Sequence, residues 1–134
     1  MEEVKELKYY IETWGCQMNE EDSEKLSGML KSIGYSKTDN IKEAGIIIYN
    51  TCCVRENAEN KVFGNLGELK HLKKQNPNLI IAICGCMTQA DGRSDIIRSK
   101  FPFVDIIFGT HNIHKFKVRI RKLINSIFSK KYIK

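Results

Sequence analysis

Two short runs of β-branched residues restrict the fold of this 134-residue chain more than any other feature of its sequence. The runs are GIIIYN at 45–50 and LIIAI at 79–83, and both are almost entirely apolar. Strands of this kind are typical of parallel sheets that are covered by helices on both faces. The composition agrees with such a core, since 42% of the residues are hydrophobic and 28% are charged.

Segments with helical periodicity separate the runs that predict strands. The first helix follows LKYYIETW at 7–14, where we expect Asn19 to act as the N-cap with Asp22 close to a capping box, and Gly34 to end the helix. A weaker helix is expected over 88–100. The buried helical faces that the spacing predicts consist of Leu26, Met29, Leu30 and Ile33, then Ala58, Val62, Leu66, Leu69 and Leu72, and finally Ile113, Phe116, Ile120, Leu123 and Ile127.

The repeated order of strand and then helix predicts an α/β fold. We expect three layers, with a mostly parallel sheet of about five strands and helices on both faces, in a flavodoxin-like or Rossmann-like arrangement. A flavodoxin-like strand order is favoured, with an edge strand near 35–38 and a further strand at 104–108. Residues 1–128 are expected to form one domain, and the basic segment 129–134 to begin a linker to a further domain.

Five cysteines, at positions 16, 52, 53, 84 and 86, are unusual for such a domain. The amino terminus, MEEVKELK, is too polar for a signal peptide, and no run approaches the length of a membrane span. We therefore expect a cytoplasmic protein without a membrane partner, in which thiols stay reduced and an odd number of cysteines is a poor disulfide framework. Buried thiols, a metal or cluster site, and a reactive cysteine remain as explanations.

The cysteines follow the predicted strands. Cys16, the pair Cys52–Cys53 and Cys86 each come after a predicted strand and before a predicted helix, whereas Cys84 lies at the end of its strand and is expected in the core. The carboxyl ends of parallel strands share one edge, and helix amino termini at that edge stabilise thiolates. Structural zinc prefers local CxxC pairs, which are absent here, so three distant thiolates fit an iron–sulfur cluster with one open iron better.

Charge is distributed unevenly along the chain. Residues 101–134 carry eight basic side chains and one acidic side chain, while residues 1–50 carry six and ten. A basic patch is a weak indication of a nucleic acid partner. The alternation of basic and apolar residues over 115–122 is also typical of a solvated helix face.

Three segments carry a more specific pattern. They are YIETWGCQMN at 10–19 with Asp22-Ser23-Glu24, NTC at 50–52 with VRENA at 54–58 and KVFG at 61–64, and GCMTQ at 85–89. In this order they resemble the motifs of the radical S-adenosylmethionine methylthiotransferase family. The GCQMN and NTCCVRENA segments are most similar to its MiaB-type, tRNA-modifying branch.

The resemblance implies an N-terminal domain that holds an auxiliary [4Fe–4S] cluster through Cys16, Cys52 and Cys86, with Cys53 and Cys84 as non-ligands. Enzymes of this branch attach a methylthio group to C2 of isopentenyladenosine, next to the tRNA anticodon. Related branches act on threonylcarbamoyl-adenosine in tRNA or on ribosomal protein S12, and they remain alternatives within the family.

The sequence departs from the family in one respect. The family binds a second [4Fe–4S] cluster and S-adenosylmethionine through a CxxxCxxC motif, and this chain has none. We therefore expect a monomeric N-terminal domain that is not catalytically competent alone and that works with radical S-adenosylmethionine and RNA-binding domains on tRNA. A flavodoxin-like module with inert cysteines and a zinc-binding interaction domain are the alternatives from other classes, although the acidic segment WGCQMNEED lacks the phosphate loop of a flavin site.

Overall fold

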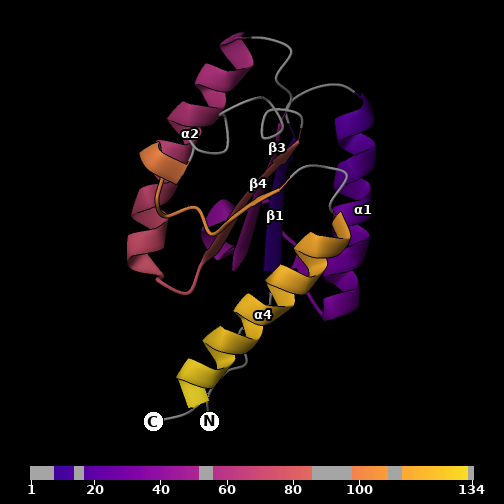
Figure 1. The fold of residues 1–134 in the computed structure, drawn as a ribbon, viewed down its shortest axis with the longest axis vertical. Coiled ribbons are helices and arrows are strands. Elements are labelled where there is room, and N and C mark those ends of the chain that lie inside the picture. The colour runs from indigo at the N-terminus through magenta and orange to yellow at the C-terminus, as the bar shows by residue number, and fades with distance from the viewer. Residues whose placement is uncertain (1–7, 14–16, 52–55, 86–97, 109–112, 133–134) are drawn as a thin grey trace.

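A computed structural model describes residues 8–13, 17–51, 56–85, 98–108 and 113–132 (Figure 1). Strands and helices alternate along these residues. The elements are β1 (Lys8–Thr13), α1 (Gln17–Ile33), β2 (Ser36–Lys37), the 3-10 helix η1 (Ile41–Glu43), β3 (Ile46–Thr51), α2 (Glu56–Gln75), β4 (Ile80–Gly85), β5 (Ile106–Phe108) and α4 (Ile113–Tyr132). No helix in these ranges is long and apolar enough to cross a bilayer.

The described strands form one five-stranded sheet in the order β2-β1-β3-β4-β5, and each neighbouring pair is parallel. This is the flavodoxin-like order, so the predicted fold class and strand order are both confirmed. The chain moves outward from β1 to β2 and then crosses back to β3. In folds of this kind, ligands bind outside the carboxyl ends of the strands at such a change of direction.

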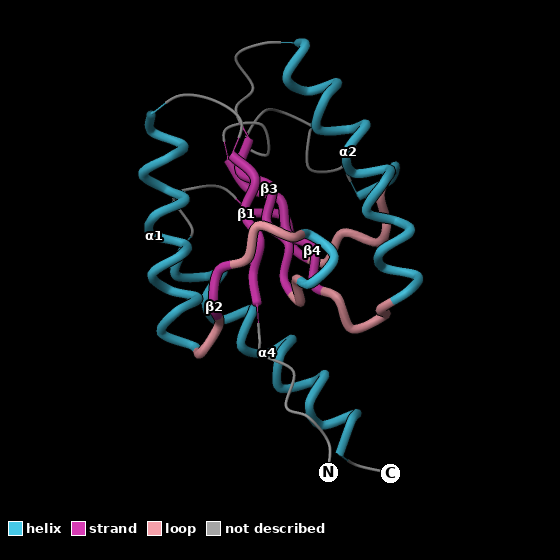
Figure 2. Tube along the Cα trace, turned by 180° about the vertical axis from the view of Figure 1, so that it is seen from behind, coloured by secondary structure: helices cyan, strands magenta, loops and turns pink. Residues whose placement is uncertain are grey.

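Helices cover both faces of the sheet, and alternate residues of each strand point to opposite layers. The buried cluster on one face joins Leu26 of α1 and Phe116 of α4 to Ile48 of β3. The cluster on the other face joins Leu66 of α2 to Ile47 of β3. Figures 1 and 2 show α1 and α2 on opposite sides of the strands. All six residues of β3 are buried, which confirms the doubly covered sheet predicted from its sequence.

The start of the first helix differs from its prediction. α1 begins at Gln17, so Asn19 lies inside the helix and the prediction that it is the N-cap is wrong. The expected helix over 88–100 lies mostly outside the described residues. Its last three residues, 98–100, are described and are helical. α4 continues to Tyr132, and the assignment of 129–134 to the start of a linker stays a prediction.

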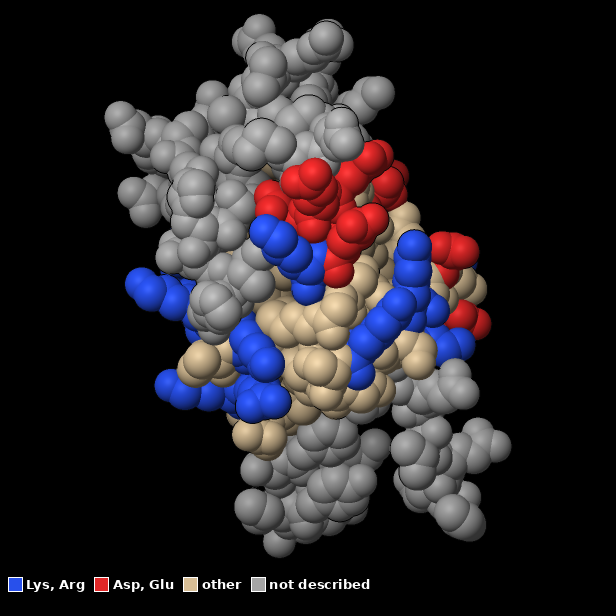
Figure 3. All heavy atoms as spheres, turned by 90° about the vertical axis from the view of Figure 1, so that its right-hand side faces the viewer, with Lys and Arg blue, Asp and Glu red and all other residues tan. Residues whose placement is uncertain are grey.

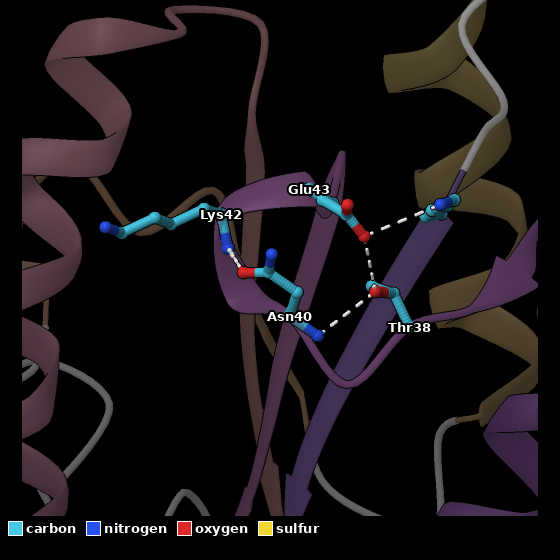
Figure 4. Close-up of polar contacts among 5 residues, drawn as sticks. Thr38, Asn40, Lys42 and Glu43 are labelled. Carbon is cyan, nitrogen blue, oxygen red and sulfur yellow. Dashed lines mark hydrogen bonds and ion pairs between the residues drawn. The ribbon is translucent and has the colours of Figure 1, made fainter.

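A polar clasp fixes the connection between β2 and β3 at the amino ends of the strands (Figure 4). Asn40 accepts a hydrogen bond from the Lys42 amide at 3.0 Å and thereby caps η1. The carboxylate of Glu43 accepts a hydrogen bond from the Thr38 hydroxyl at 3.1 Å and lies 3.5 Å from the ammonium of Lys8. The clasp stabilises the sheet at the edge opposite to the carboxyl ends.

Gly34 ends α1 in a left-handed conformation, with φ +107°. Its amide donates to the Lys31 carbonyl at 3.1 Å, and the next amide, of Tyr35, donates to the Leu30 carbonyl at 3.0 Å. This pair of bonds is the Schellman arrangement, and Tyr35 and Leu30 both belong to the buried cluster on this face of the sheet. The helix stop predicted at Gly34 is confirmed.

Two glycines of α1 provide a matched test of this stop. Gly34→Ala should lower the free energy of unfolding by about 1–2 kcal/mol, because an L residue is strained at this φ. Gly28→Ala should raise it by about 0.5–1 kcal/mol, since Gly28 lies inside the helix and a Cβ there meets no atom within 4 Å. Urea unfolding of both variants measures the two changes. If both substitutions raise or both lower the free energy of unfolding, the assignment of Gly34 as the helix stop is contradicted.

Candidate metal centre

The carboxyl ends of β1, β3 and β4 meet at one edge of the sheet. Thr13 pairs with Asn50 across β1 and β3, and Thr51 pairs with Gly85 across β3 and β4. Thr13, Thr51 and Gly85 are the last residues that the structure describes before three segments of the sequence. The parallel register therefore gives those three segments neighbouring starting points.

The predicted ligands belong to these segments. Cys16 follows Thr13 by three residues, Cys52 directly follows Thr51, and Cys86 directly follows Gly85. Cys16, Cys52, Cys53 and Cys86 all lie outside the described residues, so their assignment remains a prediction. Within the described ranges, no group of three or more His, Cys, Asp or Glu residues is placed to hold a metal ion.

Polar side chains replace apolar ones where β3 reaches this edge. Asn50 and Thr51 are both fully buried, after four buried apolar residues in the same strand. The Thr51 hydroxyl donates to the Cys84 carbonyl at 3.0 Å, and the Asn50 amide donates to the Ser23 hydroxyl at 2.9 Å. Because a buried polar group is costly unless it is hydrogen-bonded, these contacts are what makes a polar strand end compatible with the core.

Ser23 joins α1 to two strands at once. Its hydroxyl lies 2.7 Å from the Thr13 hydroxyl of β1, in addition to accepting from Asn50 of β3. Sequence reasoning placed Ser23 in a motif but gave it no role. A signal was present, because Ser23 precedes Leu26 by three and Leu30 by seven residues and so lies on the buried face of the helix.

Cys84 is a core residue, as predicted. It is fully buried among the residues packed between the sheet, α1 and α4. Burial raises the pKa of its thiol far above the ordinary value of 9.0, and the negative charge of Asp22 adds to this shift. The thiol is therefore protonated at neutral pH, which is the opposite of what a thiolate ligand needs.

Two tyrosines on the other face of the sheet are also held neutral. The Tyr10 hydroxyl donates to the Glu12 carboxylate at 2.6 Å, and this bond, together with burial, raises the pKa of Tyr10 to about 12. Burial is the main cause of the raised pKa of Tyr49. Both hydroxyls keep their protons at neutral pH and serve the packing of the α2 layer.

The surface of α1 and α4 carries charges of opposite sign in separate places. Figure 3 shows acidic side chains gathered toward one end of this face and Lys and Arg side chains elsewhere on it. The first turns of α1 contribute Glu20, Glu21, Asp22 and Glu24. These acids lie near the amino end of the helix, where its dipole favours negative charge. α4 has no acidic residue, and the exposed part of it that is described includes Lys115, Arg119, Arg121 and Lys122.

The raised pKa of Cys84 predicts how stability changes in alkaline solution. Above about pH 9 the unfolded chain releases the Cys84 proton and the folded chain retains it, so the free energy of unfolding falls with pH. This one group contributes up to about 1.4 kcal/mol per pH unit. Cys84→Ala should flatten the decline between about pH 9 and 10.5, measured by urea unfolding at several pH values. Parallel curves for the two chains would contradict the buried, neutral thiol.

The all-parallel sheet and its strand order define an α/β domain of the class that binds ligands at the carboxyl edge. A family profile described as Uncharacterized protein family UPF0004 matches residues 8–109, and the chain belongs to that family.

Two curated relatives of this chain share one name. The chain is 74% identical over 108 residues to a tRNA-2-methylthio-N(6)-dimethylallyladenosine synthase of Clostridium botulinum (strain Eklund 17B / Type B), a match that covers 81% of this chain and 24% of the relative. It is 69% identical over 116 residues to the protein of the same name from Clostridium perfringens (strain SM101 / Type A), covering 87% and 26%. The predicted membership of the methylthiotransferase family is thus confirmed, and the chain spans about a quarter of the length of these relatives.

Proposed function

We propose that this chain acts as the cluster-holding N-terminal domain of a tRNA-2-methylthio-N(6)-dimethylallyladenosine synthase. The observation that carries the proposal is the 74% identity over 108 residues to a relative of that name. The alternatives within the family, threonylcarbamoyl-adenosine tRNA and ribosomal protein S12, receive no support from these relatives. A zinc-binding or flavodoxin-like interaction module is not favoured either.

The proposed cofactor is a [4Fe–4S] cluster held by Cys16, Cys52 and Cys86. The structure supports this set through the strands before them, because β1, β3 and β4 are neighbours and end at one edge. Thiolates are the usual ligands of such clusters, and three of them leave one iron open. When bound, the cluster would supply the sulfur that is inserted at C2 of the adenosine.

The described residues contribute a frame for this centre. Ser23, Thr13 and Asn50 connect α1, β1 and β3 at the edge, while Thr51 connects β3 to the backbone of Cys84. Buried hydrogen bonds of this kind hold a strand end in one position and keep water from replacing them. We assign Cys84, which is fully buried in the core, to the packing of the domain and not to the ligand set.

The remaining parts of the reaction are assigned to segments of the relatives that this chain does not span. We place the second [4Fe–4S] cluster, the binding of S-adenosylmethionine and a dedicated RNA-binding domain there. The 134 residues alone are then expected to bind iron but not to modify tRNA. The whole enzyme is proposed to work as a monomer in the cytoplasm, where its tRNA substrate is found.

Anaerobic reconstitution with ferrous iron and sulfide tests the cluster proposal. The chain should acquire about four irons and a broad visible absorption band. Replacing Cys16, Cys52 or Cys86 by Ala should each remove most of this iron, because two thiolates cannot hold the cluster.

Cys53→Ala and Cys84→Ala are the matched controls, since they are the same substitution at the two remaining cysteines. Both should retain iron at the level of the unmodified chain. The proposal is wrong if the unmodified chain binds no iron, or if the two control substitutions are the ones that abolish binding.

The charge of α4 supports tRNA as the partner of this domain. Seven of its 20 residues are Lys or Arg, none is acidic, and the helix is anchored by the buried Phe116, which stacks on Phe108 of β5 with ring centroids 4.2 Å apart. A rigid helix with an outward row of cations matches the spaced negative charges of an RNA backbone. The row formed by Lys115, Arg119 and Lys122 lies on one side of the helix.

Fluorescence anisotropy with a labelled tRNA tests this row. The triple variant Lys115→Ala/Arg119→Ala/Lys122→Ala should weaken binding and reduce the slope of log K against log salt by about one for each phosphate that α4 no longer neutralises. Lys31→Ala/Lys70→Ala/Lys74→Ala removes the same charge from exposed positions on α1 and α2 and is the control. Equal weakening in the two variants would show that only net charge matters and would contradict a role for α4.

A further inference from the structure

The Ser23 hydroxyl is the meeting point of three elements at the edge of the sheet. It lies 2.7 Å from Oγ1 of Thr13, the last residue of β1, and it accepts a hydrogen bond of 2.9 Å from Nδ2 of Asn50 in β3. Thr13 and Asn50 are direct partners in the parallel register. One side chain of α1 therefore connects the two strand ends across their shared ladder.

Burial makes these bonds hard to replace. Asn50 is fully buried, and Thr13 and Ser23 are partly buried, so water does not freely substitute for a missing partner. Removing the Ser23 hydroxyl would leave the Asn50 amide without this acceptor inside the protein, which is costly. The two strands would stay paired through their backbones, but α1 would lose these hydrogen bonds to the ends of both strands.

The covalent chain links this junction to two of the proposed ligands. Cys16 lies in the segment between β1 and α1, and the contact between Thr13 and Ser23 joins these two elements. Cys52 follows Asn50 by two residues. Hence the same hydroxyl holds the attachment points of both cysteines.

We propose that Ser23 is a positioning residue that sets the distance between Cys16 and Cys52. It acts through Thr13 and Asn50 and does not itself contact the cluster. The inference rests on the proposed function, because it assigns these two cysteines to one centre. Groups that bond directly to metal ligands commonly contribute about 10–100-fold to metal affinity, and we expect Ser23, which acts through Thr13 and Asn50, at the lower end of this range.

A chemical cross-link tests the distance without any iron. In a chain with Cys53→Ser and Cys86→Ser, the remaining thiols are Cys16, Cys52 and the buried Cys84. Dibromobimane becomes fluorescent when both of its bromides are displaced by two nearby thiols. Adding Ser23→Ala should slow the cross-link between Cys16 and Cys52 severalfold, and Ser23→Thr, which keeps the hydroxyl, should restore it.

Two controls separate positioning from a general loss of stability. Ser32→Ala is the same substitution near the other end of α1, where the hydroxyl donates to the Met29 carbonyl at 2.6 Å on the surface. Ile81→Val lowers core stability on the opposite face of the sheet. Both should cross-link as fast as the reference chain at a temperature where every variant is folded, judged by circular dichroism.

Iron retention provides the second readout. In chains that keep all five cysteines, reconstituted with iron and sulfide, Ser23→Ala should lose iron to a chelator about tenfold faster than Ser32→Ala. The inference is overturned if Ser23→Ala cross-links at the reference rate, if Ile81→Val slows the reaction equally, or if the reference chain gives no cross-link. If Cys16 and Cys52 cross-link normally but the chain with all five cysteines binds no iron, the proposed function is overturned instead.

Discussion

The parallel pairing of β3 with β1 on one side and β4 on the other is the constraint on which the rest of the structure depends. All six residues of β3 are buried, and burying each of its aliphatic side chains contributes about 1.5–3 kcal/mol. A one-residue shift would move Ile47 and Ile48 into the wrong layers, so the register is strongly specified. The same register brings Thr13, Asn50, Thr51 and Gly85 to one edge, and that edge is where the proposed cluster ligands begin.

The carboxyl edge of the sheet is stabilised because the buried side chains of β3 change from apolar to polar over its last two residues. Ile46 to Tyr49 bind the helix layers together, whereas Asn50 and Thr51 form hydrogen bonds to Ser23 and to the Cys84 carbonyl. Polar side chains at full burial are costly unless paired, and here the pairing connects a helix and three strands. Stability of the sheet and placement of the candidate metal centre are therefore consequences of the same contacts.

Much of the fold was predictable because its signals are local. The β-branched runs predicted β3 and β4, the helical spacing predicted the buried residues Leu26 and Leu30, and Gly34 predicted the end of α1. The start of α1 was predicted less well. It lies before Asn19, because the preference of Asn for the N-cap position is only a tendency. The division of the chain at residue 128 stays a prediction.

The candidate site also has features that local sequence predicts and features that it does not. Membership of the family followed from three motifs, each of which is a short stretch of sequence, and the comparisons confirmed it. Cys84 was correctly expected in the core from its position in a strand. The contact between Ser23 and Asn50 was not foreseen, because it joins residues 27 apart in sequence and depends on how α1 packs on the sheet. The ligand set Cys16, Cys52 and Cys86 remains a prediction.

Anomalous X-ray scattering at the iron edge, from crystals of the reconstituted chain grown without oxygen, tests this ligand set most directly. We expect one iron–sulfur cluster outside the carboxyl ends of β1, β3 and β4, with the sulfur atoms of Cys16, Cys52 and Cys86 bound to three irons and no protein ligand on the fourth. Iron bound through Cys53 or Cys84, or a cluster at any other edge of the sheet, would contradict this assignment.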